Sequence, residues 1–256
     1  MKPAPFSISL TASDGTQRQS LLGMDLSELA TFFAGIGEAE FRAKQVYQWA
    51  YRRHVPDVAN ITSLSRQLRA RLAETATLRT LTLADQQTSS DGTIKFLFRT
   101  HDGFNIESVL IPSEARDDQE EPKRRTICIS TQVGCPLDCK FCATASMKLK
   151  RNLAAGEIIE QFLRVQEAAG QKITNIVFMG MGGADAELRR GVPRGGVVHR
   201  AGERSGSGFA HHHLHLGLGG RDPANGRRGG EDQAGNLVAR LHQRAAERAD
   251  ADQPAA

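Results

Sequence analysis

Three closely spaced cysteines constrain this chain more than any other feature. Cys135, Cys139 and Cys142 stand in the pattern C-x3-C-x2-C, within the stretch C-I-S-T-Q-V-G-C-P-L-D-C-K-F-C. This spacing puts three thiolates on one short loop, where they can hold a single inorganic centre. A structural zinc or an ordinary iron–sulfur cluster takes four protein ligands, yet the chain has no cysteine after Cys142 and no histidine near the loop. The pattern predicts a metal site with one open position, although buried structural cysteines or a zinc loop completed from elsewhere also fit it.

The composition sets wider limits. With 256 residues, 39% of them hydrophobic and 5% aromatic, the chain can form one large domain or two small ones. It has four cysteines, no signal-like apolar stretch at its start and no apolar run of membrane-spanning length. These features predict a cytoplasmic protein without a membrane partner, in which clustered cysteines bind metal and do not pair. The net charge of +4 permits a polyanionic partner without requiring one.

The first part of the chain is predicted to be a flexible lead followed by a helical domain. Residues 1–24 are polar and rich in turn formers, and residues 25–76 carry the patterns of three helices. The middle helix mixes aromatic and basic residues, which indicates either an RNA-facing surface or an amphipathic helix with a solvated basic face. The predicted helices run from a cap at Asp25 or Ser27 to Ala34, from about Glu38 to Arg53, and from Ser63 to Glu74.

Residues 77–125 are predicted to form a small antiparallel β-meander and a connector. Glu107 lies in the last strand, in I-E-S-V-L-I-P, and spacing alone predicts that an isolated strand glutamate faces solvent. The segment Ser113–Arg125 is charged and is typical of a solvated connector. The strands are expected at Arg79–Ala84, Thr93–Thr100 and Asn105–Ile111, separated by S-S-D-G and H-D-G turns.

Residues 126–182 are predicted to begin a parallel α/β core. A strand at Ile127–Gln132, a helix at Ala154–Ala169 and a strand at Thr174–Met179 form one βαβ unit around the cysteine loop. Such a unit opens a (βα) barrel, in which ligands bind at the carboxyl ends of the strands. Cys128 occupies an alternate position in the first strand and would by itself be a small buried hydrophobe. The second strand ends in G-M-G, where a backbone with little side-chain bulk can approach a ligand.

The cysteine loop resembles that of the radical S-adenosylmethionine (SAM) enzymes, whose [4Fe-4S] cluster keeps one iron open to bind and cleave that cofactor. The flanking T-I-C-I-S-T-Q-V-G-C and K-F-C-A-T narrow the resemblance, together with I-E-S-V-L-I-P and F-M-G-M-G. They are similar to the bacterial methyltransferases that methylate C2 of an adenine in large-subunit ribosomal RNA and in some transfer RNAs. The segment F-R-A-K-Q-V-Y-Q-W-A-Y resembles the helical accessory domain with which that family grips RNA. The resemblance covers about residues 21–182.

The resemblance implies a role for each matching residue. Glu107 matches the family's proposed general base, or proton acceptor. Cys128 matches a resolving thiol, which closes a transient disulfide bond with a methyl-carrying cysteine near the C-terminus of the family's enzymes. In the family one SAM methylates that cysteine, and a second, cleaved at the cluster, gives a radical that activates the methyl group for attack on adenine C2. The cluster ligands would be Cys135, Cys139 and Cys142, and the SAM contacts Gly180, Met181 and Gly182.

This chain departs from the family pattern at two points. Gly183 stands where the family has the SAM-contacting glutamate of G-M-G-E-P. No cysteine follows Cys142, so the methyl carrier and the disulfide partner of Cys128 are missing from the sequence. The resemblance therefore implies a protein that is truncated with respect to the family's fold and inactive as written.

The expected fold class is α/β. It comprises the N-terminal helical accessory domain and the small β-meander, then the opening βαβ of a truncated radical SAM partial (βα) barrel, and a disordered tail. The resemblance implies 23S ribosomal RNA, transfer RNA and an external electron donor as partners of a monomer. A relative that methylates adenine C8 shares the surviving motifs. A non-enzymatic RNA-binding protein with a structural metal loop is the alternative from another class.

Residues 183–256 differ in composition from the rest of the chain. They contain no Lys, Ile, Met, Cys, Trp or Tyr, but hold six of the eight histidines and most of the glycines. Such a composition cannot build a core. One interpretation is a disordered, arginine- and glycine-rich RNA-binding tail whose H-H-H-L-H binds metal. The other interpretation is a shifted reading frame.

A one-base shift can restore three family motifs in order. Codons can be chosen for Gly182–Gly195 so that removal of one G from the opening run of G yields G-E-P-x-L-N. In the same frame His211–Gly217 can yield T-I-T-S-T-S-G, and Asn236–Leu241 can yield T-S-L-H-A. Each recovery alone is weak because the codons are chosen for it. Recovery of all three in one frame favours an out-of-frame tail.

The frameshift hypothesis predicts that residues 183–256 have no stable fold, because their apolar residues are too few and too dispersed to offset the entropy of ordering. Hydrogen exchange followed by mass spectrometry should show the amides from His199 to Arg248 exchanging like those of an unstructured peptide. Protection across that range would contradict the hypothesis.

Overall fold

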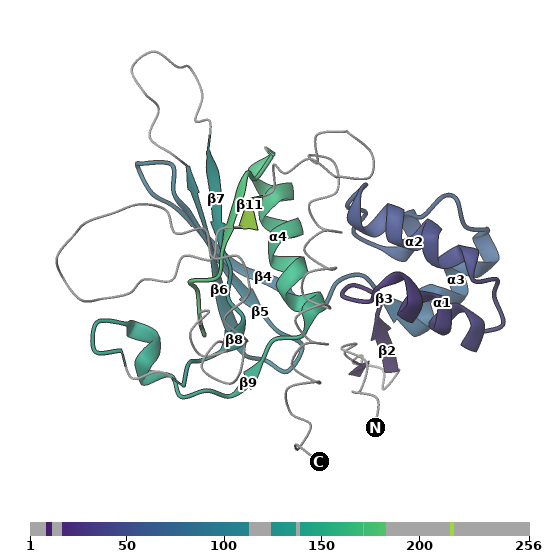
Figure 1. Ribbon diagram of the computed structural model, residues 1–256, viewed down its shortest axis with the longest axis horizontal. Helices are drawn as coiled ribbons and strands as arrows, with labels where there is room; N and C mark the ends of the chain where they lie inside the picture. Colours follow the sequence, from purple (N-terminus) through teal and green to yellow (C-terminus); the bar gives the residue numbers. More distant parts are fainter. Residues whose placement is uncertain are drawn as a thin grey trace, which may run out of the picture.

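The computed structural model describes residues 9–11, 17–112, 124–136, 139–170, 172–182 and 216–217. A group of short helices forms the N-terminal part, and a six-stranded sheet with one long helix on its face forms the rest (Figure 1). The expected α/β class is confirmed. Most of the predicted connector and, apart from 216–217, all of the predicted tail lie outside the described residues. Among the described residues, every helix is too short or too polar to cross a membrane.

The three predicted helices are present with adjusted ends. They are α1 (Leu26–Gly35), α2 (Phe41–Tyr51) and α3 (Arg66–Thr75), with a 3-10 turn η1 (Val58–Asn60) between the last two. Asp25 caps α1 as predicted: its carboxylate accepts from the backbone N–H of Glu28 at 2.8 Å, and the Glu28 carboxylate accepts from that of Asp25 at 2.9 Å. Ser65 caps α3 through a single bond, in which its hydroxyl accepts from Leu68 N at 3.2 Å.

Residues 17–24 belong to the fold, which corrects the prediction of a flexible lead over 1–24. Strand β2 (Gln17–Ser20) pairs with β1 (Ser9–Thr11) and, in parallel, with β3 (Ala76–Thr77). The residues that follow β2 are buried, and the Tyr51 hydroxyl accepts from Gly23 N at 2.7 Å and donates to Met24 O at 3.3 Å. The local sequence carries no periodic pattern that would predict this order. The segment is ordered by β3 and Tyr51, which lie far along the chain.

A glycine contact joins this segment to the sheet domain. A Cβ on Gly23 would lie 2.4 Å from the backbone nitrogen of Gly156, and Gly23 has a φ of +95°. A Cβ on Gly156 would lie 2.3 Å from the carbonyl oxygen of Leu22. The two backbones can approach this closely only because both positions are glycine.

The sheet has the strand order β11-β10-β7-β6-β5-β4. Strands β4 to β7 are antiparallel, which confirms the predicted meander, and β10 pairs with β7 in parallel. The meander and the start of the α/β core therefore share one sheet, whereas the sequence predicted separate units. The strands are β4 (Thr82–Thr88), β5 (Ile94–Arg99), β6 (Asn105–Pro112), β7 (Arg125–Cys128), β10 (Asn175–Val177) and β11 (Leu216–Gly217).

The predicted βαβ unit is confirmed. Helix α4 (Ala155–Ala169) connects β7 to the parallel strand β10 and ends at Gly170, which has a φ of 61°. The aliphatic and aromatic side chains of α4 pack against one face of the sheet. The buried residues at this contact include Ile159, Phe162 and Val165 from α4 and Phe96, Phe98, Ile106 and Ile127 from the sheet.

Several predicted strand boundaries are wrong, and two of them differ because side chains of α4 take over backbone groups. The first meander strand begins at Thr82 and not at Arg79, since Thr80 N and Leu81 N donate to the Glu160 carboxylate at 2.6 and 3.1 Å. Strand β7 ends at Cys128, since Ser130 N donates to Gln161 Oε1. The chain then turns into the separate strand β8 (Gln132–Val133), which pairs with β9 (Arg151–Asn152).

The Glu160 carboxyl is predicted to make stability fall as the pH rises. Burial raises the pKa of Glu160 from 4.5 to about 7, and the hydrogen bonds from Thr80 and Leu81 only partly oppose this rise. The folded protein therefore binds this proton more tightly than the unfolded chain does, and the resulting stabilisation is complete below about pH 4.5 and lost by about pH 7. In urea denaturation, the wild type should lose stability relative to Glu160→Gln across this range. Parallel pH profiles of the two proteins would contradict the prediction.

Candidate active site

The face of the sheet that is turned away from α4 carries two of the predicted site residues. Along β6, Ile106, Ser108 and Leu110 are buried, so Glu107 and Val109 point to the other face. Val109 pairs directly with Cys128 of β7, which places Cys128 on the same face as Glu107. The register thus brings the predicted general base and the predicted resolving thiol onto neighbouring strands of one face.

Glu107 forms an ion pair on this face. Its Oε1 atom lies 3.0 Å from Lys95 Nζ on β5, and the side chains of Glu107 and Lys95 are 40% and 46% exposed. A pair this exposed contributes little stability. The Glu107 carboxylate is half-exposed, in agreement with the solvent-facing position that spacing alone predicted, and it is positioned by a cation.

Cys128 is half-buried between β6 and β10. Burial raises the pKa of the Cys128 thiol above its usual value, although a hydrogen bond with the Met179 backbone opposes the shift. The thiol is therefore protonated at neutral pH and needs a base or a reactive partner before it can act as a nucleophile.

The predicted cluster cysteines lie on a loop closed at its base by β8 and β9. Cys135 N donates to Met147 O at 3.0 Å, and Lys150 N donates to Val133 O at 2.9 Å. Cys142 N donates to Cys139 O at 3.0 Å, directly before the short 3-10 turn η2 (Ala143–Ser146). Among the described residues, no three His, Cys, Asp or Glu side chains are close enough together to hold a metal ion. The loop therefore carries the three thiols without bringing them together.

The segment that follows β10, residues 178–182, lies across the start of this loop. Met181 N donates to Ser130 Oγ at 3.0 Å, and Met181 O accepts from Thr131 N and Gln132 N at 3.0 and 3.2 Å. The Cys135 thiol lies 3.6 Å from the carbonyl oxygen of Gly182. The predicted SAM segment and the first predicted cluster ligand are thus in direct contact.

Gly182 is required by the chain's own packing. It has a φ of +102°, and a Cβ there would lie 2.8 Å from both Thr131 Oγ1 and Gln132 Cγ. We expected glycine in this segment to let the backbone approach a ligand; at this position it lets the backbone approach residues 131 and 132.

The types of residue around the loop fit the iron–sulfur cluster that the resemblance implies, although the three thiols are not gathered around one point. Three cysteine thiols on one loop are the donor type that such a cluster takes. Beside Gly182, the buried atoms Thr131 Oγ1 and Gln132 Oε1 have no hydrogen-bond partner. Buried polar atoms without partners are uncommon and mark places where a polar ligand can bind.

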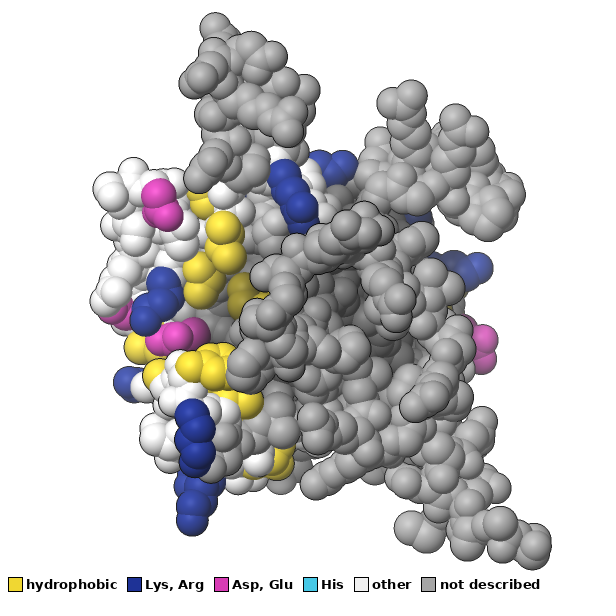
Figure 2. All heavy atoms as spheres, turned by 60° about the vertical axis from the view of Figure 1, so that its left-hand side comes forward, with side chains coloured by type: hydrophobic (Ala, Val, Ile, Leu, Met, Phe, Trp, Pro, Cys, Tyr) yellow, Lys and Arg dark blue, Asp and Glu magenta, His cyan; other side chains and the backbone are white. Residues whose placement is uncertain are grey.

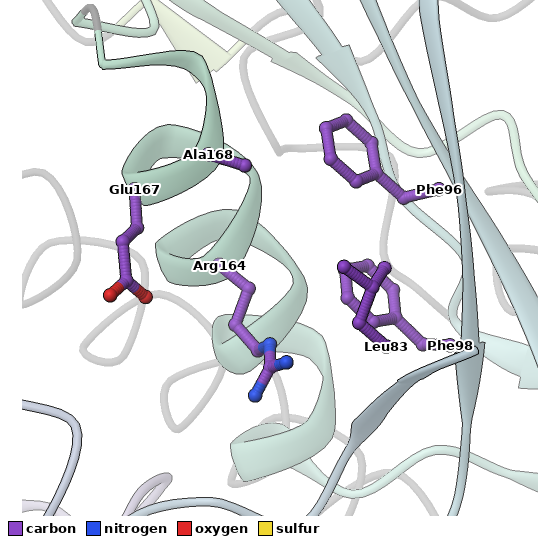
Figure 3. Close-up of a pocket in the computed structure, with 6 residues that line it drawn as sticks. All are labelled: Leu83, Phe96, Phe98, Arg164, Glu167 and Ala168. Carbon is purple, nitrogen blue, oxygen red and sulfur yellow. The ribbon is translucent and has the colours of Figure 1, made fainter. Parts of the chain in front are cut away.

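A separate pocket lies on the opposite face of the sheet. It has a volume of about 150 Å³ and is lined by Leu83, Phe96, Phe98, Arg164, Glu167 and Ala168. In Figure 3 the phenyl rings point from the strands toward α4, while Glu167 points away from them. Because Phe96 and Phe98 alternate with Lys95 and Leu97 along β5, this pocket is not part of the face that carries Glu107.

Figure 2 shows the side that carries the cysteine loop in Figure 1, where hydrophobic side chains lie among a few charged ones.

Sequence reasoning missed the polar residues that support this site. Ser108, Ser130 and Gln161 are buried and hydrogen-bonded to one another, and Arg151 pairs with two carboxylates. Serine, glutamine and arginine are usually surface residues, so their types gave no signal. The position of Ser130 and Arg151 on either side of the cysteine loop was the only available hint.

Comparisons with known proteins find a family model for the N-terminal part and relatives that match more of the chain. Residues 19–78 match the family model of the ribosomal RNA large subunit methyltransferase N-terminal domain. The chain is 48% identical over 163 residues to the dual-specificity RNA methyltransferase RlmN of Halorhodospira halophila, covering 63% of this chain and 43% of the relative. It is 40% identical over 223 residues to that of Syntrophobacter fumaroxidans, covering 85% and 60%.

A solved structure agrees with these relatives. The crystal structure of a radical SAM methyltransferase from Sphaerobacter thermophilus is 42% identical, with a TM-score of 0.57 over 66% of this chain and 50% of that one. The chain spans about half the length of the relatives it matches. The match to the Halorhodospira halophila relative covers 63% of this chain, which fits within residues 1–182. The match to the Syntrophobacter fumaroxidans relative covers 85%, or about 218 of the 256 residues, and therefore extends beyond Gly182.

Substitution of Gly182 should destabilise the junction between β10 and the cysteine loop. Gly182→Ala combines a left-handed φ with contacts of 2.8 Å, whereas Gly103→Ala has a φ of +85° and open space around the new methyl group. We expect urea denaturation to show that Gly182→Ala loses about 1–3 kcal/mol more than Gly103→Ala, because the added methyl overpacks the site. Equal losses would show that the backbone conformation alone is responsible.

Proposed function

We propose that this chain is built to methylate C2 of an adenine in 23S ribosomal RNA and in transfer RNA, because it belongs to the RlmN family of radical SAM RNA methyltransferases. The matched N-terminal domain and the identity of 40–48% to relatives named as RNA methyltransferases support this substrate class. Two cation–π pairs in α2 and directly after it, in which Arg42 lies over Phe41 and Arg53 over Trp49, are suited to contact RNA.

The contact between the Cys135 thiol and the Gly182 carbonyl carries the proposal. It joins the C-x3-C-x2-C loop to the G-M-G segment at the carboxyl end of a parallel strand, where ligands bind in α/β folds. Cys135, Cys139 and Cys142 would hold a [4Fe-4S] cluster, and Gly180, Met181 and Gly182 would lie against SAM. When bound, the cluster and SAM supply a radical formed by one-electron cleavage of the cofactor.

The chain's own residues would handle the proton and the thiol chemistry. Glu107, held by Lys95 at 3.0 Å, would accept the proton that leaves the adenine ring. Cys128, protonated at rest, matches the thiol that closes the disulfide and releases the methylated base in the family's scheme, although the sequence as written has no cysteine after Cys142 to pair with it. Both side chains are on the face of the sheet turned away from α4, so an adenine on that face could reach both.

The cysteine assignment predicts the iron content of variants. After anaerobic reconstitution, the wild type should contain about four iron and four sulfide ions per chain, and Cys139→Ala should lose most of both, because only two thiolates remain. Cys128→Ala is the matched control and should keep its iron. Zinc without iron in the wild type, or an unchanged cluster in Cys139→Ala, would contradict the assignment.

The absence of a methyl carrier predicts that the chain as written does not turn over. Residues 183–256 contain no cysteine, and loss of a covalent carrier removes the reaction path instead of slowing it. Reconstituted protein should be incubated with reductant, SAM and an unmodified ribosomal RNA fragment, and the digest analysed for 2-methyladenosine and 8-methyladenosine. Multiple turnovers would contradict the prediction. Activity that appears only after deletion of one G at codons 182 to 183 would support both the function and the shifted frame.

A further inference from the structure

Arg151 uses every N–H group of its guanidinium at the base of the cysteine loop. Its Nε and Nη2 atoms donate to the two carboxylate oxygens of Asp102 at 2.6 and 2.8 Å. Its Nη1 and Nη2 atoms donate to those of Glu157 at 2.7 and 2.8 Å, and Nη1 also donates to the carbonyl of Asn152 at 3.1 Å. Two bidentate contacts fix the position and the orientation of the planar guanidinium, and no N–H group is left to bond another partner.

The two carboxylates come from separate parts of the fold. Asp102 lies in the turn between β5 and β6, a few residues before Glu107. Glu157 lies in the first turn of α4, where it also accepts from Ala154 N at 2.9 Å. Arg151 itself is in β9, the strand that closes the cysteine loop against β8. One side chain therefore joins the loop, the β5–β6 turn and the N-terminus of α4.

The electrostatics make this junction strong. The Glu157 side chain is 0% exposed, while those of Arg151 and Asp102 are 26% and 29% exposed. Hydrogen bonds from Arg151 hold the pKa of the Asp102 carboxyl well below its usual range, and the two carboxylates raise the pKa of Arg151. Removal of the guanidinium would leave the Glu157 carboxylate buried without its main cationic partner, which is costly.

We infer that Arg151 is a positioning residue that locks the base of the cysteine loop to α4 and to the β5–β6 turn, so that the loop presents its thiols in one arrangement. The inference rests on the proposed function only in naming an iron–sulfur cluster as the group that the loop receives. Residues that hold ligands need such support, because a loose loop would cost entropy each time the ligand binds. This junction should protect three backbone hydrogen bonds, which run from Cys135 to Met147, from Lys150 to Val133 and from Leu153 to Thr131.

The test compares Arg151→Lys with Arg79→Lys. Lysine keeps the positive charge but cannot make two bidentate contacts. Arg79 pairs with Glu167 near the other end of α4 at 2.7 Å, so it is matched in residue type and helix. Hydrogen exchange at Cys135, Lys150 and Leu153 should accelerate about tenfold in Arg151→Lys, equivalent to about 1.4 kcal/mol, and stay unchanged in Arg79→Lys. Asp102→Asn keeps the contacts between Arg151 and Glu157, so exchange at the same amides should accelerate by a smaller factor. This second variant still tests the inference if Arg151→Lys does not fold.

Iron retention links the junction to the cluster. After anaerobic reconstitution, Arg151→Lys should lose iron to a chelator faster than the wild type and Arg79→Lys. Unchanged exchange at the three amides in both Arg151→Lys and Asp102→Asn would overturn the inference even if the wild type binds iron. If the wild type takes up no iron, the proposed function fails, and the exchange comparison still decides whether Arg151 locks the loop.

Discussion

The buried amide of Gln161 holds the parts of the candidate site together. Its oxygen accepts from Ser108 Oγ at 2.8 Å and from Ser130 N at 3.0 Å, and its nitrogen donates to Ser130 O at 3.0 Å and Glu157 O at 3.2 Å. The side chain thereby satisfies its full hydrogen-bonding capacity inside the core. Because it bonds both backbone groups of Ser130, Gln161 fixes the point at which the chain leaves β7 for the cysteine loop.

Ser130 extends this network to the other strands. Its hydroxyl donates to the carbonyl of Glu107 at 2.6 Å and accepts from Met181 N at 3.0 Å. The strand of the proposed base, the start of the cysteine loop and the G-M-G segment therefore depend on one pair of buried polar residues. Satisfied networks of this kind are rigid, and the loss of one member leaves several buried groups without partners. The Arg151 junction supports the far side of the same loop, so the loop is held at both ends of its base.

The sequence was most informative where structure depends on neighbours along the chain. The cap at Asp25, the end of α4 at Gly170 and the βαβ order follow from local patterns, and the structure has them. Strand alternation placed Glu107 and Cys128, but only the register shows that they share a face. The ends of the strands, the ordered segment 17–24 and the Gln161 network depend on partners distant in sequence. No local pattern encodes such pairings, since a buried glutamine and an exposed one look alike in a sequence.

The central claim is that three cysteines hold the cluster and leave one iron to the cofactor. The most direct measurement is the electron paramagnetic resonance spectrum of the reduced, reconstituted chain with and without SAM. The claim predicts that SAM changes the spectrum, because the cofactor would bind an iron that no protein ligand occupies. An identical spectrum at saturating SAM would contradict it and would favour a closed cluster or a structural metal loop.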